Sequence, residues 1–484
     1  MSSNVAKPSK RYLELEEERE LSRALMKGTK GMQEAEKTFM PKHPAEEEEN
    51  YKVRLASTTL YGSYRNTLTK MAGKVFSKPV LVNPDVPAGI GEILDNIDGQ
   101  GRNITSFLFD VMVKGLQDGI SFIFVDYTSI KPKEDGTLLT ALDVKNMGAR
   151  STAILYDASQ IIDWKSENIG GVQTLTCIRI KECANEPDPD DEWGEKEVEQ
   201  IRVLRPGSYE LWRKSEKVGG LVDDWYLYDD GVTAISYIPL IPYYTNREGF
   251  FEGLPPLQPL AELCKQHWNS SSEQVQALTF ARFAMMVFSG VEKGSIGKVG
   301  PNVIIELSDS QAKGSRIETA GEGIKAGSDD IKDIEQRMLS AGMTARVETK
   351  AGVTATASAI DSTDSDSILM AWATSLEDVA NQMLWFMADY DELSDGGTVE
   401  INKSFATSKP EGTPKDILDA CLAGKISDET FLNEWQRRDI LSDSIDVLEE
   451  LDRISKQAQQ LLAMQPQQAV PNPDNIDLSM KTVS

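Results

Sequence analysis

The feature that most constrains the fold is a seam of large apolar side chains in the last third of the chain, spaced alternately three and four residues apart. This spacing places every member on one face of an α-helix. Such a face packs along another element for its whole length, so the seam predicts a long, buried helix. Aromatic positions within it are expected to be core rather than ligand contacts. The seam consists of Leu369, Trp372, Leu376, Val379, Met383, Phe386 and Tyr390.

A second long helix is predicted from Pro256 to Ser289, which contains no strong helix breaker and as one helix would extend about 50 Å. The serines at its middle, residues 270–272, would admit a close neighbouring helix or mark a kink. A Gly- and Lys-rich segment follows, then strand-like pieces at Asn302–Leu307 and Arg316–Thr319, and a helix at Ser328–Ala341. The pattern predicts a β insertion between two helices. Residues 344–359, rich in Thr and small residues, predict a mobile loop.

The first half of the chain predicts helices at Tyr12–Met40, Glu46–Phe76 and Ile104–Leu116, with the acidic run Glu46–Glu49 in a first helical turn. The apolar run Ser121–Tyr127 predicts a buried strand. Asn185–Glu199, with two prolines and dense acid, predicts an exposed loop. Further strands at short spacing indicate an antiparallel meander: Ala153–Tyr156, Leu175–Ile180, Gln200–Arg205, Tyr209–Arg213 and Trp225–Tyr228.

Near the C-terminus we expect a strand at Asn402–Ser408 and three helices between Pro414 and Leu462. Residues 464–484 are rich in Gln, Pro and Asn and predict a disordered tail.

Charge bounds the partners of this chain. The chain has 51 Lys and Arg residues and 77 Asp and Glu residues, a formal charge of −26. This charge opposes binding to a phosphate backbone and to an anionic membrane surface. No apolar run approaches the length of a membrane span, and the charged N-terminus lacks a secretory signal. Four scattered cysteines predict reduced thiols in a cytosolic protein rather than disulfides or a zinc site.

Motifs that carry chemistry are scarce. His43 and His267 are the only histidines. Metal sites with several histidine ligands and two-histidine proton relays are therefore nearly excluded. The glycine-rich Gly294–Gly300 and Gly321–Gly327 match neither phosphate-binding nor dinucleotide patterns and are interpreted as turns. The acidic segment Asp361–Ser367 lacks the glycine and the final glutamate of a calcium loop, which favours a cap for the seam helix. We therefore expect no metal, no cofactor and no catalysis.

Several segments resemble the portal proteins of tailed bacteriophages. They are residues 27–68, GKVFSKP from Gly73, NIDGQGRNITSFL from Asn96 and DGISFIFVDY from Asp118. The most specific is IPLIPYYTNREGFFEGLPPLQPLAELCKQHWNSSSEQ from Ile238. The order of helix, β insertion, short helix, Thr-rich loop and long helix also matches, although the second helix, bounded by Gly327 and Gly342, is short for that family.

The resemblance implies an α+β, mainly helical portal fold with an α/β wing, long stem helices, a small β-containing clip and a helical crown. The implied parts are a wing at residues 1–254, a first stem helix at 255–289, a clip at 290–327 and a second stem helix at 328–343. A tunnel loop at 344–361 follows, then a long wing helix and return strand at 362–410, a helical crown at 411–463 and the tail at 464–484. The tunnel loop would offer Arg346, Lys350, Thr354 and Thr356 to the DNA channel, although Arg346 and Lys350 are equally interpretable as solvated side chains.

The resemblance also implies a function. It predicts a noncatalytic ring, usually of twelve copies, at one capsid vertex of the virion, made in the host cytoplasm. Double-stranded DNA would pass through it without sequence specificity. Expected partners are the terminase large subunit, a tail adaptor and the major capsid protein. The alternatives are a capsid scaffold or head-tail adaptor without a DNA channel, or a metal-dependent nuclease using Glu348 and Lys350, the E-x-K of VETK.

Overall fold

The fold is α+β, as the sequence predicts. The computed structural model describes residues 4–128, 148–188, 191, 193–214, 225–233, 235–282, 285–289, 313–317, 321–342, 355–403, 414–437, 440–442 and 445–464. The chain divides into two compact units, Met1–Phe405 and Ala406–Ser484. The boundaries of the portal-like parts other than those discussed below stay predictions.

Four helices open the first unit, each burying one apolar face. The predicted continuous helix from Tyr12 to Met40 is interrupted at Gly28, whose φ of 78° is accessible to glycine at little cost. A second interruption separates the two helices expected as one between Glu46 and Phe76. The elements are the 3-10 turns η1 (Asn4–Ala6) and η2 (Glu36–Thr38) and the helices α1 (Lys10–Lys27), α2 (Thr29–Glu34), α3 (Glu48–Ser57) and α4 (Ser63–Val75).

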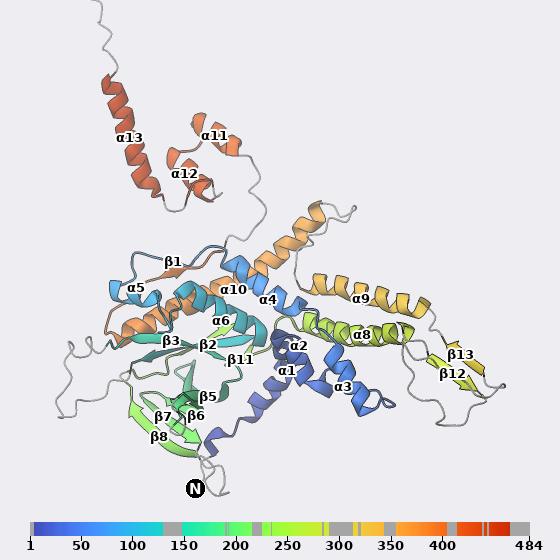
Figure 1. Ribbon diagram of the computed structural model, residues 1–484. Helices are drawn as coiled ribbons and strands as arrows, with labels where there is room; N and C mark the ends of the chain where they lie inside the picture. The colour runs from blue at the N-terminus through green and yellow to red at the C-terminus, as the bar shows by residue number, and fades with distance from the viewer. Residues whose placement is uncertain are drawn as a thin grey trace, which may run out of the picture. The chain divides into compact units, whose positions relative to one another are not determined.

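A three-stranded antiparallel sheet of order β3-β2-β9 lies at the centre of this unit (Figure 1). Its middle strand, β2 (Ile120–Tyr127), confirms the buried strand predicted from the apolar run. Its neighbours are β3 (Ser151–Asp157) and β9 (Leu240–Tyr244). Helices α5 (Ala88–Leu94) and α6 (Ile104–Asp118) precede it. At Gly119, between α6 and β2, a Cβ would lie 2.1 Å from the backbone oxygen of Leu254, so only glycine fits.

A five-stranded antiparallel meander confirms four of the five predicted meander strands. The fifth, Ala153–Tyr156, is wrongly placed, because it lies in β3 and pairs with β2 in the central sheet. Its strands are β4 (Ile161–Ile169), β5 (Val172–Pro187), β6 (Glu195–Arg205), β7 (Ser208–Lys214) and β8 (Trp225–Val232). The bounds predicted for the loop at Asn185–Glu199 are wrong, because β5 continues to Pro187 and β6 begins at Glu195. Glu186 and Lys196 stand opposite each other in the register, and opposite charges on paired strands stabilise such an extension.

Two short strand pairs complete the sheets, β10 (Arg247–Gly249) with β11 (Glu252–Gly253) and β1 (Leu81–Val82) with β14 (Val399–Glu400). The strand expected at Asn402–Ser408 is misplaced: β14 ends before Asn402, and residues 404–408 lie outside the described part. The backbone N–H groups of Val399 and Ile401 donate to side chains of helix α10 (Ala355–Tyr390), which fixes this segment.

The next helix, α8 (Gln258–Arg282), ends before the Ser289 that the sequence suggests. Residues 285–289 form β12 (Met285–Ser289), paired antiparallel with β13 (Lys313–Ile317). The sequence MMVFS contains a β-branched and an aromatic residue, which suit a strand. Residues 290–312, with the predicted Asn302–Leu307 strand, lie outside the described part.

Helix α9 (Gly321–Ala341) begins seven residues earlier than predicted. The turn interpretation of Gly321–Gly327 is therefore wrong, whereas the assignment of these residues to a clip stays a prediction. Each helical glycine costs about 1 kcal/mol relative to alanine, but packing against α8 outweighs that cost.

Helix α10 (Ala355–Tyr390) contains the predicted seam. Six seam positions are buried and Tyr390 is half-buried. The helix begins in the predicted tunnel loop, so residues 355–361 are helical rather than loop, consistent with the high helix propensity of Ala355, Ala357 and Ala359. The acidic segment Asp361–Ser367 lies inside this helix and is neither a cap nor a calcium loop.

The second unit contains the three helices expected between Pro414 and Leu462. They are α11 (Pro414–Leu422), α12 (Asp428–Arg437) and α13 (Val447–Met464). Leu432 is buried on α12, and the rings of Phe431 and Trp435 lie 4.4 Å apart between centroids. The predicted tail, residues 465–484, lies outside the described part.

Candidate functional site

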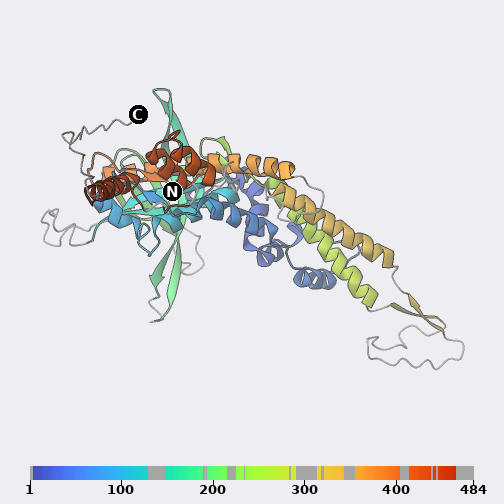
Figure 2. The ribbon, with the colours of Figure 1, turned by 90° about the horizontal axis from the view of Figure 1, so that it is seen from above.

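Helices α8 and α9 lie side by side and project from the sheet-containing body, with the β12–β13 pair at their far end (Figures 1 and 2). We divide the pair into two parts. The base comprises residues 258–272 of α8 and 334–341 of α9. The arm comprises residues 273–282, β12, β13 and residues 321–333. The two parts differ in what surrounds them.

The base is part of the main hydrophobic core. Trp268 and Cys264 of α8 and Ile334 and Met338 of α9 are all buried in that cluster. Burial raises the pKa of the Cys264 thiol to about 12, so this cysteine is an apolar filler rather than a nucleophile. The base is thus a rigid mount for the arm.

His267 was predicted to be either a packed or a surface residue, and the structure shows that it is packed. The ring is buried in the base, and its Nε2 lies 3.3 Å from Glu335 Oε1 on α9. The Tyr61 ring lies 5.2 Å away between centroids. His43 is exposed in the turn before α3. Neither histidine has a serine and an acid arranged for nucleophilic catalysis in the described part of the chain.

A buried ion pair ties α3 to the base. The Arg54 guanidinium donates to both oxygens of Glu46 at 2.8 Å and to the carbonyl of Pro41 at 3.1 Å. Its Nη1 also donates to Ser272 Oγ on α8 at 3.4 Å. The hydrogen bond from Arg54 lowers the pKa of Glu46 to about 2. Glu46 itself lies outside the first helical turn predicted for it, because α3 begins at Glu48.

A second buried cluster fixes the segment that leads into α8. Arg19 of α1 donates to the carbonyl of Gly253 at 2.7 Å, and Arg23 donates to Asp118 Oδ1 at 2.9 Å. Burial opposes the charge of Arg23, but Asp118 and Glu16 outweigh it and raise the Arg23 pKa above its ordinary value. These residues join α1, α6 and the chain just before α8, and no sequence motif marked them.

The described helical part of the arm has no core of its own. No described side chain is buried from residue 273 to 282 or from 321 to 333. Within it, Gln274 Nε2 donates to the Ile324 carbonyl at 2.8 Å. A Cβ on Gly327 would lie 2.2 Å from Gln274 Oε1, so the glycine permits this close approach. The two helices touch, yet their outer faces are uncovered.

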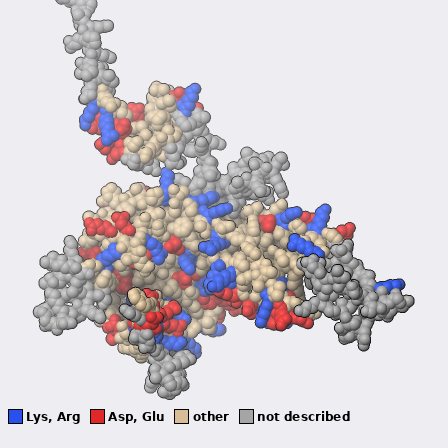
Figure 3. Space-filling model, in the orientation of Figure 1, with Lys and Arg blue, Asp and Glu red and all other residues tan. Residues whose placement is uncertain are grey.

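Charges of both signs cover the arm (Figure 3). On α9, Lys332 lies 3.5 Å from Asp329 and Arg337 lies 3.5 Å from Asp333. All four side chains are largely exposed, so these pairs contribute little to stability. The described part of α9 thus presents no uniformly basic strip that would hold a polyanion.

The predicted channel residues fall mostly outside the described part. Arg346, Lys350 and Thr354 lie there, as does Glu348 of the nuclease alternative. Thr356 lies in the first turn of α10. The proposed grouping of the four channel residues therefore stays a prediction.

The seam residues, in contrast, are placed as predicted. Trp372 Nε1 donates to the Thr245 carbonyl at 2.7 Å, and the Tyr243 hydroxyl donates to the Trp372 carbonyl at 3.3 Å. These bonds attach α10 to the central sheet, because Tyr243 is part of β9 and Thr245 follows it. Trp372 is a core residue, 8% exposed.

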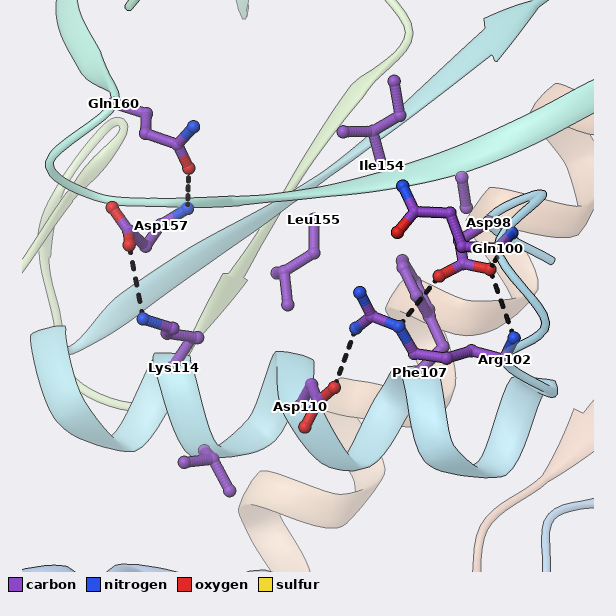
Figure 4. Close-up of a pocket in the computed structure, with 12 residues that line it drawn as sticks. Asp98, Gln100, Arg102, Phe107, Asp110, Lys114, Ile154, Leu155, Asp157 and Gln160 are labelled. Carbon is purple, nitrogen blue, oxygen red and sulfur yellow. Dashed lines mark hydrogen bonds and ion pairs between the residues drawn. The ribbon is translucent and has the colours of Figure 1, made fainter. Parts of the chain in front are cut away.

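A hollow of about 450 Å³ lies between α6 and β3 (Figure 4). Its charged side chains pair with one another: Arg102 with Asp98 and Asp110 at 2.8 Å each, and Lys114 with Asp157 at 3.3 Å. A wider hollow of about 570 Å³ is lined by Tyr127, Arg202 and Tyr390 among others. Arg202 is likewise paired, with Asp126 and Glu182.

Among the described residues there is no cluster of three or more His, Cys, Asp or Glu side chains that could hold a metal ion. The described helices also include none long and apolar enough to cross a membrane.

Comparison with known proteins identifies a domain family and a number of similar solved structures. The family is described as "Domain of unknown function (DUF4055)" and matches residues 256–391, which span α8 to α10. A search of curated proteins found no match. Among solved structures, the "Neck of empty GTA particle computed with C6 symmetry" aligns at 10% identity over 79% of this chain and 91% of that chain, with a TM-score of 0.38.

The "Neck of native GTA particle computed with C12 symmetry" aligns at 10% identity over 77% of this chain and 89% of that one, with a TM-score of 0.37. At these TM-scores the similarity supports no inference about function. The matched DUF4055 region coincides with the helix pair, the strand pair at its far end and the seam helix.

Proposed function

We propose that this chain is the subunit of a phage portal, a ring of usually twelve copies at one capsid vertex of the virion. Double-stranded DNA would be packaged and ejected through its channel, and the ring would dock the terminase large subunit, a tail adaptor and the major capsid protein. The resemblance of the segments at Asn96, Asp118 and Ile238 to portal proteins motivates this proposal.

The observation that carries the proposal is the arm without a core. A helix pair of this length cannot gain its stability from propensity alone, since most helical stability in proteins comes from packing of an apolar face. Val275 of the arm is 38% exposed, and Leu339, on the adjoining base of α9, is 44% exposed. Copies of the same pair standing side by side around an axis would cover such side chains, and they would form the stem of a portal.

A closed ring needs two different surfaces on each subunit, because a head-to-tail contact joins one patch to another. The rigid base suits this requirement. It fixes the direction of the arm relative to the body through the Arg54 pair and the Trp268 cluster. A fixed direction gives every copy the same rotation to the next, which is the condition for closure.

The charge of −26 fits a passive conduit. Each phosphate neutralised by Lys or Arg would add salt-dependent affinity and thus resist movement of the DNA. A wall with excess acid and paired cations, such as those on α9, would repel the duplex weakly from all sides. The proposed role is noncatalytic, with energy supplied by the docked motor.

The proposal is tested by measuring the mass of the purified full-length chain and imaging it by electron microscopy. We expect rings near twelve subunits with a central opening wide enough for a DNA duplex. A protein that stays monomeric or dimeric across concentrations and salt conditions, or that forms rings without an opening, would support the scaffold or adaptor alternative.

The noncatalytic assignment has its own assay. The full chain is incubated with DNA and Mg²⁺, in parallel with Glu348→Ala. We expect no cleavage by either protein. Cleavage by the wild-type chain that disappears in Glu348→Ala would replace this assignment with the nuclease alternative.

A further inference from the structure

Helix α4 carries a concentration of positive charge that is unusual in this acidic chain. Although the formal charge is −26, residues 50–84 contain six Lys or Arg side chains and no Asp or Glu. Three of these cations, Arg65, Lys70 and Lys74, are exposed on α4. In Figure 3, blue side chains gather in the middle of the visible face, where Figure 1 places α4. We call the exposed face of α4 from Arg65 to Lys74 the basic strip.

The packing of α4 fixes the basic strip in place. The residues of α4 that belong to the main hydrophobic core are Tyr64, Leu68, Met71, Ala72 and Val75. At 3.6 residues per turn, Arg65 lies at one edge of the opposite, exposed face and Lys70 and Lys74 lie towards the other edge. The exposed residues between them are Asn66, Thr69 and Gly73. A Cβ on Gly73 would have nothing within 4 Å, so the middle of the strip is open to a close partner.

The charges of the basic strip are available to a partner. Within the part of the chain that the structure describes, Arg65 and Lys70 form no ion pair. On α9, in contrast, Lys332 and Arg337 lie beside aspartates. Lys70 and Lys74 are one turn apart, and like charges at this spacing weaken a helix. The arrangement therefore does not serve the stability of α4, and it favours an anion from outside the chain.

The composition of the strip distinguishes among classes of anionic partner. Protein interfaces are centred on buried aromatic or aliphatic side chains and are depleted in Lys, whereas the described residues of α4 expose no large apolar side chain. A helix at a membrane surface inserts its apolar face into the lipid, but the apolar face of α4 is in the core. Arg, Lys, Asn and Thr side chains are common donors to the phosphate backbone of DNA.

We infer that the basic strip binds the phosphate backbone of double-stranded DNA without reading its sequence. From Arg65 to Lys74 the helix rises about 14 Å, which equals the rise of about four phosphates along one strand of a duplex. The choice of double-stranded DNA among nucleic acids rests on the proposed function, whereas the strip itself requires only a phosphate backbone. Because fixed cations resist sliding, the strip suits DNA held against the body rather than DNA moving through the channel.

The experiment measures binding of a fluorescent DNA duplex to the full chain by anisotropy over a range of salt concentrations. The variant Arg65→Gln/Lys70→Gln/Lys74→Gln removes three charges and keeps good helix formers. We expect binding about tenfold weaker or more at low salt, and a slope of log affinity against log salt reduced by about 2–3, since each phosphate contact contributes about 0.9. Two duplexes of unrelated sequence should bind equally well.

The matched control is Lys10→Gln/Lys332→Gln/Lys456→Gln, which removes the same charge from side chains that are 93%, 68% and 68% exposed elsewhere. It should keep the wild-type affinity and slope, and thermal unfolding curves verify that both variants fold. Equal weakening by both variants would reduce the effect to net charge and overturn the inference. A wild-type chain that fails to bind the duplex at low salt would also overturn it, whatever the ring measurement shows. Strip-dependent binding by a chain that never forms rings would remove the ring and retain the strip.

Two further measurements identify the occupant. Polyglutamate, vesicles of phosphatidylserine and phosphatidylcholine, and an RNA duplex are titrated in parallel and are expected to bind no more tightly than DNA. Tighter binding of any of them that disappears in the strip variant would give the strip to that partner and overturn the inference. In acetylation read by mass spectrometry, DNA should protect Lys70 and leave Lys10 reactive. Equal reactivity of Lys70 with and without bound DNA would place the contact elsewhere on the chain and overturn the inference.

Discussion

Arg54 and Glu46 form a two-point ion pair in which both donor–acceptor distances are 2.8 Å, with side chains only 3% and 8% exposed. The pair stands between the N-terminal helices and α8, because Arg54 also reaches Ser272. A charge in such a position is stable only while its partner is present. The direction of the arm therefore depends on this contact.

Replacing Arg54 by methionine leaves the buried Glu46 carboxylate without its partner. Breaking a buried pair in this way costs about 3–5 kcal/mol, and we expect a loss of that order in the free energy of unfolding of the first unit, measured by urea denaturation. Arg65→Met, on the exposed face of α4, is the matched control with an expected change below about 0.5 kcal/mol. Equal urea midpoints for the two variants would contradict the assigned role.

The same pair predicts a dependence on pH. The pKa of Glu46 falls from 4.5 to about 2 on folding, so the unfolded chain binds this proton more readily than the folded chain. The stabilisation is complete above about pH 4.5 and is lost as the pH falls towards 2. The difference in urea midpoint between wild type and Glu46→Gln should therefore shrink over that interval. Glu17→Gln, an exposed change on α1, is the matched control.

How far the sequence predicts this fold depends on whether the decisive contact is local. The seam of α10 was predictable because its period alone defines a face, and burial of Leu376 and Met383 follows from that face. The meander was predictable from closely spaced apolar runs. Strand β4 could not be predicted in this way, because most of its residues are polar. Its apolar residues are Ile161, Ile162, Trp164 and Ile169, which do not alternate regularly with polar ones.

Long-range contacts account for what the sequence did not predict. Arg54 and Ser272 are 218 residues apart, so no motif links them. The start of α9 was missed because glycines ordinarily indicate turns, whereas here Gly327 serves close packing against Gln274. Of the candidate site, the helix pair was predicted and its anchoring residues were not.

The glycines of α9 give a paired test of helix packing. A Cβ added at Gly323 would have nothing within 4 Å, whereas a Cβ on Gly327 would displace Gln274. Gly323→Ala should stabilise the helix by up to about 1 kcal/mol. Gly327→Ala should give no gain or a net loss, because Gln274 must release the Ile324 carbonyl. Amide hydrogen exchange of the α9 backbone measures both effects.

The control for this pair is the double variant Gln274→Ala/Gly327→Ala. Removing the Gln274 side chain clears the space, so the alanine at position 327 should then slow exchange relative to Gln274→Ala alone. Equal slowing by Gly323→Ala and Gly327→Ala in the otherwise wild-type chain would show that the close approach does not constrain residue 327.

Trp372 offers the sharpest test of how α10 is attached to the central sheet. Phenylalanine at this position keeps most of the apolar volume but removes the N–H that donates to the Thr245 carbonyl. An unsatisfied buried group costs about 1–3 kcal/mol, so Trp372→Phe should lower the thermal midpoint clearly. Trp385→Phe, on the same helix but 46% exposed, should lower it much less. Because both changes have the same chemistry, equal shifts would mean that the hydrogen bond to Thr245 contributes nothing to holding α10 against the sheet.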